Sequence, residues 1–115
     1  MKITRAISIR QPYVELILQG TKQYEYRSMP TNIRERVYLY ASLQQGGTPK
    51  QLQQTGKTFE ALAKGVIVGS VEIVDCKWDE KNGSYAYTLR NPKRIRKALK
   101  ATNQPNPRFW IPKFQ

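Results

Sequence analysis

Hydrophobic and polar residues alternate along several short runs of the chain, and this period of two is typical of half-buried β-strands. In the first run Ile7 and Ile9 face one side, whereas Ser8 and Arg10 face the other. A later run is almost continuously apolar and rich in β-branched residues, which predicts a long central strand. Gly69 inside that run indicates a bulge or a close backbone approach. The predicted strands cover residues 4–10, 23–28, 37–42, 65–76, 84–90 and 106–112.

A helical spacing follows the first predicted strand. Val14, Ile17 and Leu18 lie at positions i, i+3 and i+4, which places them on one face of a helix over residues 12–19. A proline stands in its first turn, where the missing N–H costs nothing. Gly20 supplies the left-handed stop at the end of the helix.

Two further stretches have weaker helical character. The polar stretch 44–62 contains the helix-compatible segments 49–54 and 59–64, and we expect it to be a surface insertion. The basic run 93–100 has apolar residues spaced as on one side of a short helix, so it also predicts a helix. The pair Asn91-Pro92 before it is expected to end the preceding strand.

Five or six strands with short helices at these spacings predict an α+β fold, a small, partly closed β-barrel flanked by short helices. The chain has 115 residues, which fits a single domain over residues 1–115. A domain of this size buries a sufficient hydrophobic core to fold without disulfides or metals.

The charge balance indicates the class of partner. The chain has 20 Lys and Arg against 8 Asp and Glu, a formal net charge of +12. Such an excess attracts polyanions over long range and favours nucleic acid, through counterion release. A basic surface that only keeps the protein in solution is the alternative.

Two residue types are scarce, and their scarcity excludes several chemistries. The chain has one cysteine, Cys76, and no histidine. A lone thiol forms no internal disulfide and fits a reducing compartment, so we expect a cytoplasmic protein. Ser-His and Cys-His mechanisms and a structural zinc site are excluded within this chain, and no cofactor is expected. No apolar run approaches the length that spans a bilayer, so no membrane partner is expected.

The junction between the first helix and the second predicted strand concentrates charge. Lys22, Glu25 and Arg27 lie within six residues there, and Glu25 and Arg27 share one face of the strand. One interpretation is a solvated lysine beside a structural ion pair. The other is a cleft that handles a polar ligand, and the sequence pattern leaves both open.

The basic run offers a second candidate surface. Arg94, Arg96 and Lys97 lie in its middle, and they either contact phosphates or form a solvated face.

The order of these motifs resembles the ASCH domain family, including its small prokaryotic members, within the PUA-like superfamily. The resemblance spans nearly the whole chain except the 44–62 insertion. Its carriers are Ser8-Ile9-Arg10-Gln11-Pro12-Tyr13, Gly20-Thr21-Lys22-Gln23-Tyr24-Glu25-Tyr26-Arg27-Ser28, Tyr38-Leu39-Tyr40-Ala41-Ser42, Gly65-Val66-Ile67-Val68-Gly69, Val74-Asp75-Cys76, Asn91-Pro92 and Phe109-Trp110.

The resemblance implies a PUA-like β-barrel that binds nucleic acid, RNA in preference to DNA, in a cleft beside the first helix. In this binding module Tyr13, Tyr24 or Tyr26 would stack a base. The oligomeric state is left open. The residues that would line the cleft are Arg10, Gln11, Tyr13, Lys22, Glu25 and Arg27.

The resemblance also implies an enzymatic alternative, because some members hydrolyse the amide of N4-acetylcytidine and another is a ribonuclease. Lys22 matches the lysine of the amidohydrolases, whereas their threonine position is Glu25 in this chain. If the domain is an enzyme, Lys22 and Glu25 are its candidate catalytic residues. The glutamate of those enzymes has no clear match, and Glu72 is a candidate only because it lies on the predicted central strand. A third possibility is a protein-interaction adaptor with a vestigial cleft.

Overall fold

The computed structural model describes residues 2–115, and six strands and two short helices form its regular structure. In chain order the elements are β1 (Ala6–Gln11), α1 (Tyr13–Leu18), β2 (Tyr24–Arg27), β3 (Arg36–Gln45), α2 (Pro49–Gln54), β4 (Val66–Asp79), β5 (Ser84–Leu99) and β6 (Phe109–Trp110).

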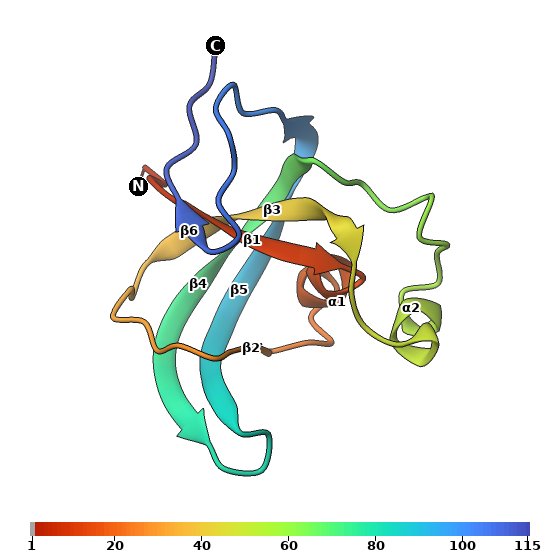
Figure 1. Cartoon of the computed structure of the whole chain (residues 1–115). Coiled ribbons are helices and arrows are strands. Elements are labelled where there is room, and N and C mark those ends of the chain that lie inside the picture. The colour runs from red at the N-terminus through yellow and green to blue at the C-terminus, as the bar shows by residue number, and fades with distance from the viewer. Residues whose placement is uncertain (1) are drawn as a thin grey trace.

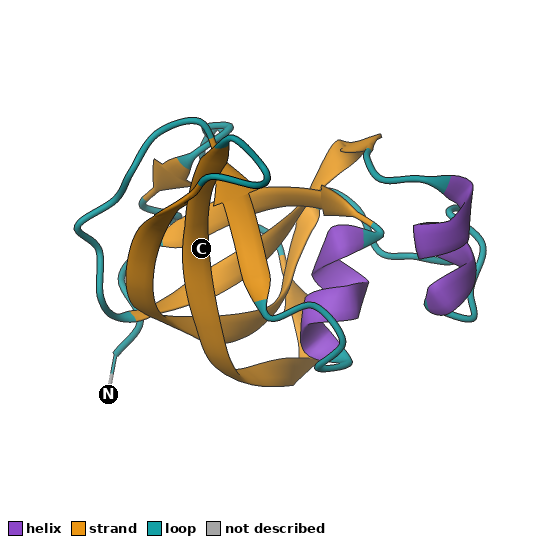
Figure 2. Cartoon of the chain, turned by 90° about the horizontal axis from the view of Figure 1, so that it is seen from below, coloured by secondary structure: helices purple, strands orange, loops and turns teal. Residues whose placement is uncertain are grey.

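The six strands form one curled sheet in the order β2-β5-β4-β3-β1-β6. β1 pairs with β3 in parallel, and the other neighbouring pairs are antiparallel. Figure 1 shows the long β4 and β5 ribbons running the length of the molecule, with β1 and β3 crossing them. In Figure 2 the sheet curves around an interior and α1 lies at one open end. The expected α+β fold, a partly closed barrel with flanking short helices, is confirmed.

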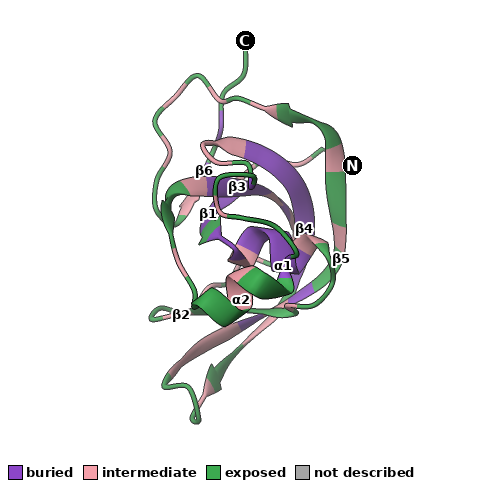
Figure 3. Cartoon of the chain, turned by 90° about the vertical axis from the view of Figure 1, so that its right-hand side faces the viewer, coloured by how far each residue is buried: buried purple, intermediate pink, exposed green. Residues whose placement is uncertain are grey.

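The hydrophobic core lies inside this curl. Val37, Leu39 and Ala41 alternate along β3, and each side chain is fully buried, as their period of two predicts. Tyr87 and Leu89 face the same interior from β5. α1 contributes Val14 and Ile17 to the core, and the centre of the molecule is accordingly buried in Figure 3. The core therefore fixes the position of α1 and of the chain that follows it.

Gly69 marks the irregularity expected in the central strand. The register between β4 and β3 shifts beside it, and so does the register between β4 and β5. A Cβ atom at this position would lie 2.5 Å from the carbonyl oxygen of Lys93 and 2.6 Å from the Leu18 side chain. Only glycine leaves room for that approach, which lets the sheet bend.

The prediction of a helix over residues 93–100 is wrong, because β5 continues as a strand to Leu99. Ile95 and Leu99 pack against a second core cluster that contains Ile67 and Trp110. A spacing of four residues also fits one face of a strand, so the apolar pattern did not distinguish the two structures. The tertiary contacts with this cluster therefore decided in favour of the strand.

The sequence had indicated that Asn91-Pro92 ends the strand, but β5 continues through this pair. Asn91 adopts a left-handed conformation with φ 53°, and the β4–β5 register shifts around it. A bulge accommodates a proline that has no N–H to donate, so β5 passes through this pair.

The polar stretch begins later than expected, because Gln44 and Gln45 still belong to β3. Its first helix is confirmed as α2, where Thr48 and Gln51 form a capping box. Residues 59–64 form turns and no helix, and the Lys64 ammonium donates to the carbonyl groups of Phe59 and Leu62. No residue of α2 is buried, and Figure 3 shows it on the outside of the molecule.

Candidate functional site

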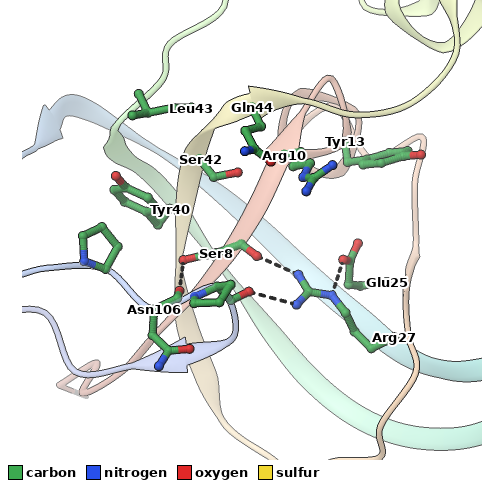
Figure 4. Close-up of a pocket in the computed structure, with 12 residues that line it drawn as sticks. Ser8, Arg10, Tyr13, Glu25, Arg27, Tyr40, Ser42, Leu43, Gln44 and Asn106 are labelled. Atoms are coloured by element: carbon green, nitrogen blue, oxygen red, sulfur yellow. Dashed lines mark hydrogen bonds and ion pairs between the residues drawn. The ribbon is translucent and has the colours of Figure 1, made fainter.

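A cavity of about 540 Å³ opens between β1, the end of β3, β2 and the loop before β6. The parallel register places Ser8 opposite Tyr40 and Arg10 opposite Ser42, so these four side chains come from adjacent strands. Figure 4 shows them along one side of the cavity, with Glu25 and Arg27 on the other side. The lining residues are Ser8, Arg10, Tyr13, Glu25, Arg27, Tyr40, Ser42, Leu43, Gln44, Pro105, Asn106 and Pro107.

Glu25 and Arg27 form the ion pair that their shared strand face indicated. Arg27 Nε donates to Glu25 Oε2 at 2.8 Å, and the Glu25 side chain is only 8% exposed. Burial of the carboxylate makes a charge-assisted hydrogen bond more valuable than it would be in water. The pair therefore holds the Arg27 guanidinium in a fixed position at the wall of the cavity.

The Arg27 guanidinium also joins the two sides of the cavity. Its Nη2 donates to the Ser8 carbonyl at 2.6 Å and its Nη1 to the Pro107 carbonyl at 3.3 Å. These bonds connect β2 to β1 and to the loop before β6, and Figure 4 shows the bonds to Ser8 and Glu25 meeting at the Arg27 guanidinium. The position of Arg27 is thus determined by three partners.

Lys22 lies behind Glu25, beside the cavity rather than among the residues that line it. Its Nζ is 3.8 Å from Glu25 Oε1 and 4.9 Å from the ring centroid of Tyr13. Burial lowers the pKa of Lys22 below its usual value of 10.5; the Glu25 carboxylate opposes this shift, and the charge of Arg27 adds to it. A lysine in such surroundings gives up its proton more readily than an exposed lysine does.

The structure does not bring Gln11 to the cavity. Its side chain is buried, donates to the carbonyl of Ala63 at 3.0 Å and accepts from the N–H of Glu15 at 3.0 Å. These bonds connect the start of α1 to the segment just before β4. Gln11 thus holds the helix in place instead of facing the cleft.

The basic run lies apart from the cavity. Arg94 donates to both carboxylate oxygens of Glu15 on α1, each at 2.9 Å, so its guanidinium is already engaged. Arg96 and Lys97 are exposed on the far half of β5, and neither forms an ion pair within residues 2–115. No Asp or Glu follows Glu80 in the sequence, although nine Lys and Arg residues do. The last third of the chain therefore carries most of the net charge.

Several lining residues were missed from the sequence. Tyr40 and Ser42 follow the same alternation as the core residues of β3, but on its other face. Their role depends on the parallel pairing of β1 with β3, which alternation alone does not reveal. The last strand is shorter than the predicted 106–112, because β6 covers only Phe109–Trp110, so Asn106 and its neighbouring prolines lie in an irregular loop that pattern alone did not reveal.

Among residues 2–115, no group of three or more Cys, Asp and Glu side chains is placed to hold a metal ion. Neither helix there has the length and apolar character required to cross a membrane.

Comparison with known proteins identifies a family model and two curated relatives. The model of the ASCH domain matches residues 7–105. Activating signal cointegrator 1 from Homo sapiens is 22% identical to the chain, and the protein of the same name from Mus musculus is 23% identical. Each alignment covers 90% of this chain but only 21% of the relative, so the chain spans about a fifth of their length.

Solved structures from Zymomonas mobilis share the fold. A crystal structure of ASCH from this organism superposes with a TM-score of 0.60 at 15% identity, covering 93% of this chain and 85% of the other. A mutant of that protein gives a TM-score of 0.62 at 14% identity, covering 96% and 90% of the two chains. These likenesses confirm the expected ASCH, PUA-like architecture.

Proposed function

The chain belongs to the ASCH domain family, and on that premise we propose that its cavity binds one nucleotide of a single-stranded nucleic acid, RNA in preference to DNA. The volume of about 540 Å³ lies within the range of small-molecule sites. The proposed setting is the cytoplasm, where a free Cys76 stays reduced.

The observation that carries the proposal is the combination of cationic and aromatic side chains in the cavity wall. Arg10 is exposed and makes no hydrogen bond or ion pair with any residue in the described part of the chain. Arg27 lies opposite, held by Glu25, while Tyr13 and Tyr40 provide aromatic surface. Guanidinium groups suit phosphate and base oxygens, and aromatic rings suit base stacking.

The proposed roles follow from how each group is held. Arg10 is free to contact a phosphate, because its side chain is not engaged elsewhere among residues 2–115. Arg27 is fixed and would meet an oxygen of the base, whereas Glu25 would orient Arg27 or accept from an exocyclic amine. Gln11 would act indirectly, by positioning α1. Arg96 and Lys97 would contact phosphates outside the cavity, whereas Arg94 beside them is held by Glu15.

Replacing the free cation in the cavity tests this proposal. Arg10→Ala is expected to weaken binding of a mixed single-stranded RNA about tenfold and to reduce the salt dependence of binding by about one unit of slope. Fluorescence anisotropy at several salt concentrations measures both. Lys50→Ala is the matched control, because it removes one exposed charge from α2, which does not line the cavity. Equal behaviour of the two variants would contradict the proposal.

A second candidate function is favoured by Lys22. Its lowered pKa raises the fraction of neutral amine, and Glu25 Oε1 lies 3.8 Å away. A neutral amine in this position would take a proton from an attacking water or ribose hydroxyl, and Glu25 would relay it. The reaction would be hydrolysis of RNA or of a modified-nucleoside amide.

Mass spectrometry distinguishes this activity from binding alone. The protein is incubated with single-stranded RNA and with a modified-nucleoside panel that includes N4-acetylcytidine. Turnover by the wild type is expected to disappear in Lys22→Ala. Lys22→Arg is the informative control, because arginine keeps the positive charge but does not act as a base. A product that both variants still form would rule out Lys22 as the base.

A further inference from the structure

A second depression, of about 410 Å³, lies on the outer face of the sheet and away from the barrel interior. It extends from β2 onto the β4–β5 hairpin, whose tip projects beyond the rest of the molecule in Figures 1 and 3. Its lining includes Tyr24, Tyr26, Lys77, Trp78 and Ala86. Tyr24 and Tyr26 are 42% and 39% exposed, which is high for large aromatic side chains.

The strand register explains the shape of this depression. Tyr26 pairs with Ala86, and Ala86 pairs in turn with Lys77, so the three side chains form a row across the sheet. Directly opposite residues point to the same face of the sheet. Because the side chain of Ala86 in the middle strand is small, it forms the bottom of the depression. The two tyrosine rings stand on one side of it and Lys77 on the other. The two tyrosine rings lie side by side, with centroids 6.4 Å apart.

Lys22 connects this depression to the cavity. Its Nζ lies 4.9 Å from the ring centroid of Tyr13, which lines the cavity, and 5.2 Å from that of Tyr26, which lines the depression. The Lys22 ammonium therefore lies near one ring of the cavity and one ring of the depression. If a single strand places one nucleotide in the cavity and the next nucleotide beyond Lys22, that second nucleotide would meet Tyr26, and the one after it would meet Tyr24.

We propose that Tyr24 and Tyr26 form a stacking platform for the nucleotides that flank the one held in the cavity. This platform, with Lys77 at its far side, takes a single-stranded oligonucleotide, because only unpaired bases expose their faces to a ring. The inference rests on the proposed nucleotide-binding function. It assigns a role to the projecting hairpin that the cavity does not require.

The local charges indicate that stacking, rather than attraction to phosphates, provides the affinity here. Lys77 lies 3.5 Å from Asp75, so its charge is partly compensated. At the hairpin tip, Lys81 is accompanied by Asp79 and Glu80. The platform is thus nearly neutral in an otherwise basic protein. Removing a ring should lower affinity and leave the salt dependence unchanged, since no counterion is involved.

Tyr24→Ala is the decisive variant, because the Lys22 ammonium lies near the ring of Tyr26, so truncating Tyr26 would also disturb Lys22. Binding is measured with nucleoside monophosphates and with hexanucleotides of RNA and DNA. The variant is expected to bind hexanucleotides about tenfold more weakly, with an unchanged salt slope and unchanged monophosphate binding. The same loss of affinity is expected for RNA and for DNA hexanucleotides, since stacking involves the base and not the sugar. Tyr24→Phe should restore the affinity because it retains the ring.

The control is Phe114→Ala, since Phe114 is an aromatic residue with a similar exposed fraction, 43%, outside the platform. The melting temperature of Tyr24→Ala is measured first, to show that the variant is folded. If the folded variant binds hexanucleotides as tightly as the wild type does, the platform is overturned. If Arg10→Ala weakens binding of monophosphates, but the wild type binds hexanucleotides no more tightly than monophosphates, the proposed function stands and only the platform is overturned. If the wild type binds none of these probes, the proposed function fails as well.

Trp78 supplies an independent readout. It is 52% exposed at the depression, whereas Trp110 is 8% exposed in the core. A stacked strand beside the platform is expected to quench the fluorescence of the wild type more strongly than that of Trp78→Phe, in which only Trp110, hydrogen-bonded to Ser8 of the cavity wall, remains. Equal quenching of the two proteins would mean that the strand does not reach Trp78 and would contradict the platform.

Discussion

Glu15 is a buried carboxylate that joins three parts of the molecule. Its side chain on α1 is 5% exposed and accepts two hydrogen bonds from Arg94 of β5 and one from Gln19. The ammonium of Lys57, from the polar stretch, lies 3.9 Å away. Burial raises the pKa of Glu15, but the bonds from Arg94 and Gln19 and the nearby charges outweigh burial and hold it below 4.5.

The lowered pKa of Glu15 predicts that the free energy of unfolding decreases in acid. A carboxylate whose pKa is lowered on folding stabilises the protein above the unfolded value of 4.5, and the contribution is lost as pH falls through the folded pKa. Glu15→Gln is expected to lower the free energy of unfolding by about 2 kcal/mol at pH 7 and to flatten its acid dependence. Urea denaturation between pH 3 and 7 measures this. The exposed Glu60→Gln should change neither quantity, and an unchanged acid dependence in Glu15→Gln would contradict the prediction.

At the same scale, the sequence predicted contacts between near neighbours and missed distant ones. The Glu25–Arg27 pair was expected because both residues lie on one face of a short strand. The Glu15–Arg94 pair joins residues 79 positions apart, and it depends on how β5 curls past α1. Gln11 was assigned to the cleft on the basis of the family resemblance. Adjacent residues of a strand face opposite sides, and Gln11 points into the interior.

β4 and β5 are the elements on which the rest of the sheet is built. Their apolar and β-branched residues predicted most of β4, as residues 65–76, and the first half of β5, as residues 84–90. The second half of β5 was missed because a register shift and a proline interrupt the alternation. Such irregularities are determined by the partner strand, so they leave an ambiguous pattern in the sequence. Gly69 was the one local sign of this bend.

Gly69→Ala is therefore expected to destabilise the fold strongly. The new methyl group would meet the carbonyl oxygen of Lys93, which is backbone and does not move aside. We expect a loss of about 2–3 kcal/mol in the free energy of unfolding, as measured by chemical denaturation. Gly56→Ala serves as the comparison, because it adds a methyl into open space and only has the cost of a positive φ, about 1 kcal/mol. A smaller loss for Gly69→Ala than for Gly56→Ala would contradict the account of the bend.

At the scale of the whole molecule, the fold class followed from strand count and spacing, whereas the cavity did not. A curled six-stranded sheet was foreseeable because each strand exposes one apolar face that must be covered. The wall of the cavity combines the end of β3 with the loop before β6. These segments meet only because β1 lies between β3 and β6 in the sheet, which is a property of the topology.

The charge distribution predicts how salt affects binding. Changing Arg96, Lys97 and Lys100 together to Gln should reduce the salt slope for single-stranded RNA by about two, if each contacts one phosphate. Changing Lys2, Lys50 and Lys113 to Gln removes the same charge elsewhere and should have a smaller effect on the slope. Anisotropy titrations at several salt concentrations provide the comparison. Equal slopes for the two triple variants would remove the basic run from the interface.

The absence of acidic residues after Glu80 has a consequence for the approach to a partner. Lys93, Arg96 and Lys97 lie close together on the far half of β5, and positive charge gathered there gives the molecule an electric dipole, on which the field of a polyanion exerts a torque. The molecule turns its basic part toward the polymer before the surfaces touch, which raises the fraction of collisions that are productive. The asymmetry should thus appear in the association rate at low salt, even for variants whose final complex is weak.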